Sequence, residues 1–125
     1  MAVLQPAVPI LLVIDVSRAA AFFRDGLGFA VDFLYGEPPF YGAVSRDAAC
    51  LHLRFVAEPP FAAAAAREVS LIAATIEVDD VMALHAEFVG RGVAFGQAPT
   101  KQVWGGVDFH VADPDGNVVS FVTYG

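Results

Sequence analysis

The chain has 125 residues, enough for one domain with a proper hydrophobic core and too few for a second domain of ordinary size. Hydrophobic residues make up 57% of the sequence and charged residues 17%, a composition that excludes an intrinsically disordered chain. The formal net charge of -7 repels phosphate backbones, so it argues against nucleic acid as a partner and favours cationic ligands.

Nothing near the N-terminus indicates a membrane-bound or secreted protein. The apolar run 7–14 is too short to span a bilayer, and no basic residue precedes it as in a signal peptide. Cys50 is the only cysteine, so an intramolecular disulfide is impossible, as is usual in a reducing cytosol. We therefore expect a soluble, cytoplasmic protein with no membrane contact.

The first half of the chain predicts one helix and four strands. An apolar, strand-like run ends at Asp15, a good N-cap for a helix over Ser17–Asp25, and Gly26-Leu27-Gly28 ends that helix. The pair Arg46-Asp47 has the chemistry of a turn between the last two strands. The predicted strands are Val8–Ile14, Phe29–Tyr35, Tyr41–Ser45 and Ala49–Phe55.

The second half repeats this order 64 residues later. Three landmarks align at that offset, namely Asp15 with Asp79, Gly26 with Gly90, and Gly28 with Gly92. The predicted helix is Val81–Gly90, and the predicted strands are Leu71–Val78, Val93–Gln97, Val103–Ala112 and Asn117–Tyr124. We expect an α+β fold, a single domain over 1–125, with tandem βαβββ modules over about 6–56 and 70–125. Residues 57–69 join them as a linker or short helix.

Two stretches resemble a known family. Residues 104–117 are similar to the W-G-x-x-E-F-x-x-x-D-P-x-G-N segment of bleomycin-resistance proteins, with Asp108 in place of the glutamate. The pattern over 7–29 resembles the same subgroup of the vicinal-oxygen-chelate (glyoxalase/bleomycin resistance protein/dioxygenase) superfamily. This resemblance implies a cleft-forming mixed sheet and a homodimer in which the N-terminal strand crosses to the partner, with Pro9 placed where that strand would bend. A dimer would also cover the exposed sheet edges.

The resemblance also predicts where a metal would bind. Metal-dependent relatives take ligands from the first and last strand of each module, and these positions fall at Val8, His52, Ala73 and Ser120. Only His52 is a good ligand, whereas such a centre needs at least three donors. We therefore expect no metal and no cofactor. A different site built from His52, Asp108 and His110 stays open as an alternative.

Alternation along two strands predicts which polar side chains line a cleft. Period-two geometry sends Leu51, Leu53 and Phe55, and likewise Val107, Phe109 and Val111, toward the helix-covered core. The opposite face then carries His52, Arg54, Asp108 and His110, as a polar cleft wall or as solvent-facing groups. His85, on the second helix, is predicted to lie on the surface.

Aromatic side chains gather where loops should meet this cleft, and flat rings of this kind stack on planar ligands. They are Phe33, Tyr35, Phe40, Tyr41 and Trp104. The resemblance puts Phe40 and Trp104 at the two positions that sandwich the drug in bleomycin-binding relatives, although Val107 stands where those proteins have an arginine. Pro38 and Pro39 should hold Phe40 in place.

No catalytic machinery is visible in the sequence. Cys50 lacks neighbours that would lower its thiol pKa, and neither a nucleophile elbow nor a phosphate loop occurs. The residues and the resemblance together predict metal-independent binding and sequestration of an aromatic or cationic small molecule. Two alternatives stay open: a lyase, isomerase or dioxygenase with an atypical site, and a sensor of a metabolite.

Overall fold

The computed structural model describes residues 1–58 and 71–125 and contains the two predicted βαβββ modules. The first module consists of β1 (Ile10–Val13), α1 (Val16–Ala21), the π-helical turn η1 (Phe22–Gly26), β2 (Ala30–Tyr35), β3 (Tyr41–Arg46) and β4 (Ala49–Phe55). The second consists of β5 (Ile72–Glu77), α3 (Val81–Gly90), β6 (Gln97–Lys101), β7 (Val107–Ala112) and β8 (Val118–Thr123). The linker predicted over 57–69 lies, from residue 59 on, outside the described residues.

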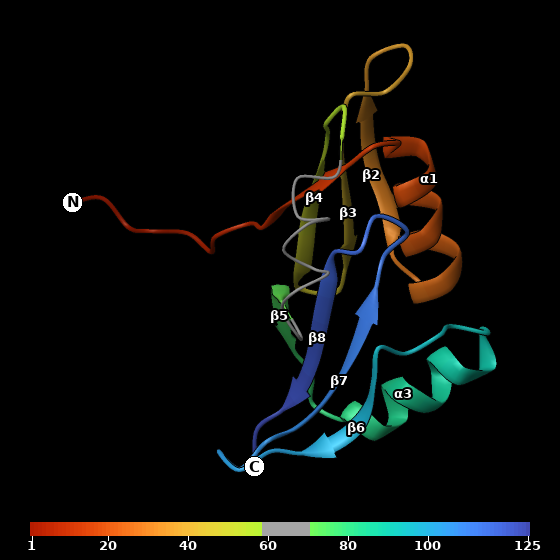
Figure 1. The fold of residues 1–125 in the computed structure, drawn as a ribbon. Coiled ribbons are helices and arrows are strands. Elements are labelled where there is room, and N and C mark those ends of the chain that lie inside the picture. Colours follow the sequence, from red (N-terminus) through yellow and green to blue (C-terminus); the bar gives the residue numbers. More distant parts are fainter. Residues whose placement is uncertain (59–70) are drawn as a thin grey trace.

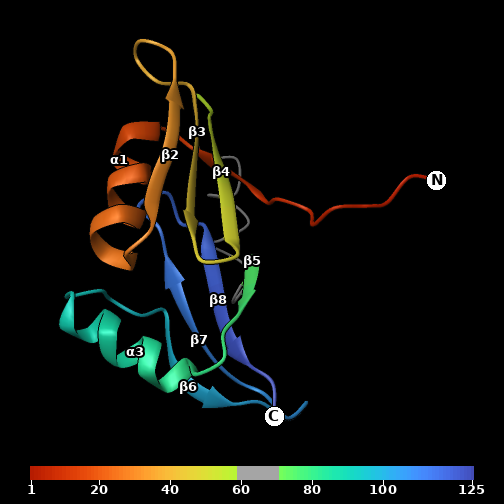
Figure 2. The ribbon, with the colours of Figure 1, turned by 180° about the vertical axis from the view of Figure 1, so that it is seen from behind.

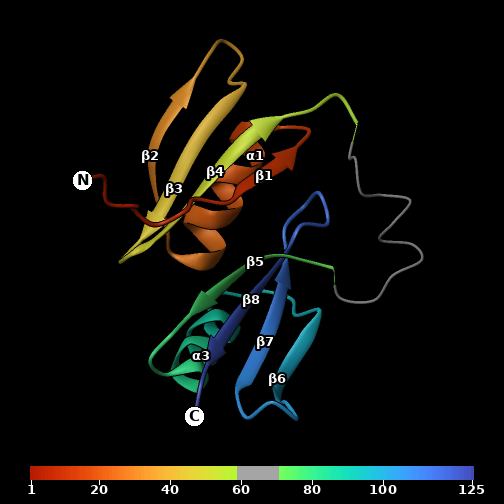
Figure 3. The same cartoon turned by 90° about the vertical axis from the view of Figure 1, so that its left-hand side faces the viewer.

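Each module forms its own four-stranded mixed sheet, in the orders β1-β4-β3-β2 and β5-β8-β7-β6. In each, the first strand pairs in parallel with the last, and the remaining pairs are antiparallel. Both helices lie on the same side of the two sheets (Figures 1 and 2). Figure 3 looks onto the opposite side, which neither α1 nor α3 covers, and this side is called the open face below.

The apolar sets predicted from alternation form the core under the helices. Leu51, Leu53, Phe109 and Val111 are fully buried, in one cluster with Phe23 of η1 and Phe88 of α3. Burial of this kind contributes about 25 cal/mol for each Å² of apolar surface removed from water. The prediction was wrong for Phe55, which is 45% exposed at the last position of β4, beyond the cover of α1.

Aspartate caps start both helices, as predicted, but the cap of α3 lies one residue later than predicted. Asp15 caps α1 by accepting a hydrogen bond from the backbone N–H of Arg18, as predicted. Asp80 rather than Asp79 caps α3, through the N–H of Ala83. His85 on α3 is half-buried, with its ring 4.5 Å from that of Phe95, so the surface position predicted for it was wrong.

The sheet edge of the second module also differs from prediction. Pairing of β6 with β7 begins at Gln97, opposite His110, so the strand covers 97–101 rather than 93–97. Val93 instead packs against the core next to the end of α3. Between β6 and β7 the N–H of Gln102 donates to the carbonyl of Gly106 at 2.8 Å, and this turn keeps 103–105 out of the strand.

The hairpin turn between β7 and β8 connects the second module to the first (Figure 3). Asp115 Oδ1 accepts hydrogen bonds from the N–H of Ile14 at 3.1 Å and from the guanidinium of Arg18 at 3.3 Å. The Asn117 side-chain amide donates to the carbonyl of Leu12 at 3.0 Å. The Asp-Pro-Asp-Gly-Asn motif of the family-like segment therefore also holds the modules together.

The N-terminal segment before β1 extends away from both sheets (Figure 1). Val3 and Leu4 in this segment are almost fully exposed. The first strand is thus shorter than the predicted Val8–Ile14, since Val8 lies outside β1. None of the described helices has the length and hydropathy needed to cross a bilayer.

Candidate functional site

The open face of the first module carries a cluster of aromatic rings. The ring centroid of Phe33 lies 5.1 Å from that of Tyr35, 6.4 Å from that of Tyr41 and 5.9 Å from that of His52. Tyr41 and His52 meet edge to face, and the Tyr41 hydroxyl shares a hydrogen bond of 2.9 Å with His52 Nδ1. Four of the predicted site residues therefore lie together, and we call them the aromatic cluster.

Strand register explains this grouping. A bulge between Val31 and Phe33 shifts β2, so that Phe33 lies opposite Ala43 and Tyr35 lies opposite Tyr41. Arg54 is the cross-strand neighbour of Tyr41 on β4. Its exposed guanidinium contacts only the nearby carbonyl of Phe55, at 3.4 Å, among the protein groups described, so a positive charge is available beside the cluster.

Phe40 lies in the loop between β2 and β3, with 58% of its surface exposed. Its ring lies against Gly36, whose φ of +97° favours glycine, and a Cβ added at Gly36 would overlap the phenyl ring. The loop therefore supports one face of an aromatic ring and leaves the rest of it in solvent.

Trp104 has a closely similar environment in the second module. It is 55% exposed in the turn between β6 and β7, and a Cβ added at Gly106 would overlap its indole. The indole centroid lies 5.8 Å from that of Tyr124, which is also exposed. The second glycine of Trp-Gly-Gly is thus needed for the position of the indole.

A single chain does not bring Phe40 and Trp104 together. The β2–β3 loop lies at one end of the molecule and the β6–β7 turn at the other, next to the C-terminus (Figures 1 and 3). The two rings predicted to sandwich one ligand therefore could do so only if a second copy of the chain supplied one of them.

Asp108 and His110 project from β7 on the open face, yet both are only 5% exposed, so the predicted polar cleft wall is largely closed here. Asp108 Oδ1 accepts hydrogen bonds of 2.8 Å from the side-chain amides of Gln97 and Gln102. Asp108 Oδ2 lies 3.3 Å from His110 Nε2.

The two amide donors keep the Asp108 carboxylate ionised. Burial raises the pKa of Asp108, but the hydrogen bonds from Gln102 and Gln97 and the adjacent His110 outweigh burial and leave it below the ordinary value. Sequence reasoning missed both glutamines, because they lie on β6 and in the following turn, whose register was not predicted. With both oxygens engaged, Asp108 is poorly placed to bind a cationic ligand directly.

The donors at the family's metal positions do not fit a metal. Val8 carries no donor atom, and the neighbours of His52 and Ser120 on the adjacent parallel strands are Ile10 and Thr75. Across 1–58 and 71–125, no three His, Cys, Asp or Glu side chains are grouped as metal ligands. Because His52 lies in the sheet of the other module, these residues of a single chain do not form the alternative site of His52, Asp108 and His110.

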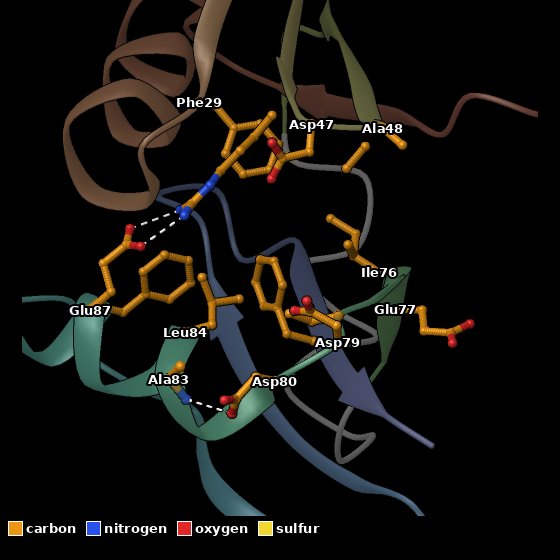
Figure 4. Close-up of a pocket in the computed structure, with 15 residues that line it drawn as sticks. Phe29, Asp47, Ala48, Ile76, Glu77, Asp79, Asp80, Ala83, Leu84 and Glu87 are labelled. Carbon is orange, nitrogen blue, oxygen red and sulfur yellow. Dashed lines mark hydrogen bonds and ion pairs between the residues drawn. The ribbon is translucent and has the colours of Figure 1, made fainter. Parts of the chain in front are cut away.

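A cavity of about 530 Å³ lies elsewhere, between the modules (Figure 4). The β3–β4 turn, the end of β5 and one side of α3 line it. Arg46 and Glu87 meet at its edge through two hydrogen bonds of 2.8 Å. None of the site residues predicted from the sequence lines this cavity.

Comparison with solved structures gives close likenesses over the whole chain. The bleomycin-binding protein of bleomycin-producing Streptomyces verticillus, complexed with copper(II)-bleomycin, is 31% identical, with 100% of this chain and 99% of that chain covered and a TM-score of 0.77. A bleomycin-binding protein complexed with bleomycin is 23% identical, covering 98% and 100% of the two chains, with a TM-score of 0.78. The bleomycin resistance determinant encoded on transposon Tn5 is 22% identical, covering 97% and 98%, with a TM-score of 0.77.

A comparison with curated protein sequences gives no match. The family model of the Glyoxalase/Bleomycin resistance protein/Dioxygenase superfamily matches residues 4–121, which cover the first module and all of the second except the end of β8. The paired βαβββ modules and the conserved length of the solved relatives agree with that match. This chain therefore belongs to the glyoxalase/bleomycin resistance protein/dioxygenase superfamily.

Proposed function

We propose that the protein binds and sequesters a planar aromatic small molecule that can carry positive charge, without a metal and without chemical conversion. The observation that carries the proposal is Trp104, an indole seated over Gly106 with more than half of its surface exposed. An exposed, rigidly supported ring offers a stacking surface, which adds roughly 0.5–1.5 kcal/mol per aromatic pair beyond simple burial.

The proposed site is a cleft shared by two copies of the chain. One copy contributes Phe40 and the aromatic cluster with Arg54, and the other contributes Trp104, with Asp108 and His110 on the same module. The separation of the two loops within one chain supports this arrangement (Figure 1). The extended N-terminal segment, with Val3 and Leu4 exposed, supports a homodimer in which that segment packs on the partner.

One solved relative, 31% identical, is a bleomycin-binding protein in complex with copper(II)-bleomycin. That likeness supports a ligand with planar heteroaromatic and cationic parts. The net charge of -7 would also attract such a ligand to the protein. Val8, Ile10 and Thr75, which supply no strong metal ligand, support binding by stacking and hydrogen bonds alone.

A fluorescence titration tests the proposal, because Trp104 is the only tryptophan. Bleomycin should quench or shift the emission with saturation, and Phe40→Ala should weaken binding about fivefold, the equivalent of about 1 kcal/mol. Phe55→Ala is the matched control, since it removes a similarly exposed phenyl ring outside the aromatic cluster. Thermal midpoints measured beside affinity separate loss of binding from loss of folding.

Three outcomes would contradict parts of the proposal. A proven ligand that leaves Trp104 emission unchanged would place the site elsewhere. A monomer by light scattering at micromolar concentration would exclude the shared cleft. Recovery of a chemically altered ligand would favour the second candidate, an enzyme of the same superfamily, for which the close pair of Asp108 and His110 is the specific observation.

A further inference from the structure

The internal repeat gives the molecule two equivalent junctions between its modules. At each, the hairpin turn of one module approaches the start of the helix in the other. The two helices can be aligned on their N-cap residues. The Asp15 side chain accepts a hydrogen bond from the N–H of Arg18, and the Asp80 side chain accepts one from the N–H of Ala83. Arg18 and Ala83 therefore occupy the same position in the two modules.

The junction at α1 is filled. Five residues, 113–117, separate β7 from β8, and this long turn reaches the first module. The Asp115 side chain is 1% exposed and is paired with the guanidinium of Arg18 at 3.3 Å. A carboxylate from the turn and a cation from the helix thus occupy the space between the modules.

The junction at α3 is hollow. Only Asp47 and Ala48 separate β3 from β4, and Ala83 stands where the other junction has Arg18. The shorter turn and the smaller side chain leave the cavity of about 530 Å³, which lies within the usual range for small-molecule sites (Figure 4).

The lining of this cavity combines an apolar wall with acidic groups. Ile76, Val78 and Leu84, which are partly buried, contribute the accessible apolar surface, and the buried rings of Phe29, Phe88 and Phe121 lie behind them. Asp47, Glu77, Asp79 and Asp80 contribute carboxylates. The one lining cation, Arg46, is already paired with Glu87 at 2.8 Å. Within 1–58 and 71–125, Asp47, Glu77 and Asp79 form no ion pair, and no cation at the start of α3 corresponds to Arg18 in the filled junction.

We infer that this junction cavity is a second small-molecule site, which takes a compact aromatic amidinium or ammonium ion. The ring would lie against the apolar wall formed by Ile76, Val78 and Leu84. The charged group would lie near Asp47 and Asp79, which face the cavity from opposite modules (Figure 4), as Arg18 lies beside Asp115 in the filled junction. This site shares no residue with the proposed cleft.

Benzamidinium and its neutral analogue benzamide form a matched pair of probes for this site. In 0.15 M salt, amide chemical shifts should saturate with benzamidinium and be largest over 46–49 and 79–88, with a dissociation constant separate from that of any response of Trp104 in the cleft. Benzamide should bind at least about fivefold more weakly, because it lacks the charge. Equal affinities, no saturation at millimolar concentration, or shifts centred on the aromatic cluster would overturn the inference.

Ala83→Arg supplies the cation of the filled junction and should abolish benzamidinium binding. Ala86→Arg adds the same charge to the same helix outside the cavity lining and should bind like the parent chain. If both variants lose binding equally, general charge repulsion explains the effect and the inference fails.

Asp79→Asn tests the site even if Ala83→Arg does not fold. It should weaken benzamidinium binding about fivefold and leave benzamide binding unchanged. No change in benzamidinium affinity would contradict the assigned charge contact. Phe40→Ala should leave benzamidinium binding intact, so failure of the shared cleft and failure of this site are separately visible.

Discussion

Replacing Asn117 with alanine should destabilise the protein more than a single polar contact usually does. The Asn117 side-chain amide is buried and donates two hydrogen bonds. One goes to the carbonyl of Leu12 in the first module at 3.0 Å, and the other to Asp113 Oδ2 in its own turn at 2.9 Å. Alanine would leave both acceptors without this donor while keeping the backbone of the turn.

The magnitude follows from the two acceptors. A neutral hydrogen bond contributes about 0.5–1.5 kcal/mol to the free energy of unfolding, and one to a charged group contributes about 1.5–3 kcal/mol. Asn117→Ala should therefore cost about 2–4 kcal/mol, a large part of the roughly 5–15 kcal/mol typical of a domain. The thermal midpoint should fall by roughly 10 °C for a chain of this size.

The cost should also depend on pH through Asp113. Burial raises the pKa of the Asp113 carboxyl, although Asn117 and two backbone N–H groups oppose the effect. Without the Asn117 amide the pKa rises further, so ionised Asp113 is less well tolerated in the folded state. Since a carboxyl group with a raised pKa stabilises the fold when protonated, the deficit of Asn117→Ala should shrink as the pH falls through this raised pKa.

Urea unfolding followed by circular dichroism measures the effect directly. Ser45→Ala is the control, because it removes a single hydrogen bond of 2.9 Å to exposed Asp32 and should change stability by less than about 0.5 kcal/mol. If Asn117→Ala costs less than about 1 kcal/mol at neutral pH, the turn does not hold the junction as argued.

Three further outcomes follow from other parts of the structure. Hydrogen bonding from Arg46 lowers the pKa of Glu87, so Glu87→Gln should reduce the free energy of unfolding, by at most about 1 kcal/mol for this partly exposed pair. This loss should persist above pH 5 and vanish as the pH falls through the lowered pKa. Gly106→Ala should displace Trp104 and alter its emission maximum, whereas Gly90→Ala, in open space, should not. Elemental analysis of the purified protein should find far less than one zinc, iron, nickel or manganese ion per chain.

The internal repeat could be predicted because its signals are local. Asp15, Gly26 and the alternation in β4 each act on neighbouring residues, so the helices and most strand faces followed from sequence alone. The β6 edge could not be predicted in this way. Val93 and Phe95 have the pattern of a strand, but they pack on the core, and pairing with β7 decides that the strand starts at Gln97.

The candidate site was only partly predictable for a related reason. Phe33, Tyr41 and His52 lie on one face of the sheet. Strand alternation alone predicts this for Tyr41 and His52, whereas the position of Phe33 also depends on the bulge in β2. The burial of Asp108 depends on Gln102, in a turn whose shape the sequence did not predict. Nor does the pattern of one chain say that Phe40 and Trp104 lie at opposite ends of it.

The two junctions explain why a repeat in sequence does not make the modules equivalent in chemistry. The same strand-and-helix unit ends one hairpin with five residues and the other with two, and it places Arg18 in one helix start and Ala83 in the other. At the first junction the longer turn and Arg18 fill the space between the modules, as is usual in a packed interior. At the second junction the shorter turn and Ala83 leave the corresponding space as a cavity. The contact between Asp115 and Arg18 stabilises the pair of modules, while the hollow junction is free to take a ligand.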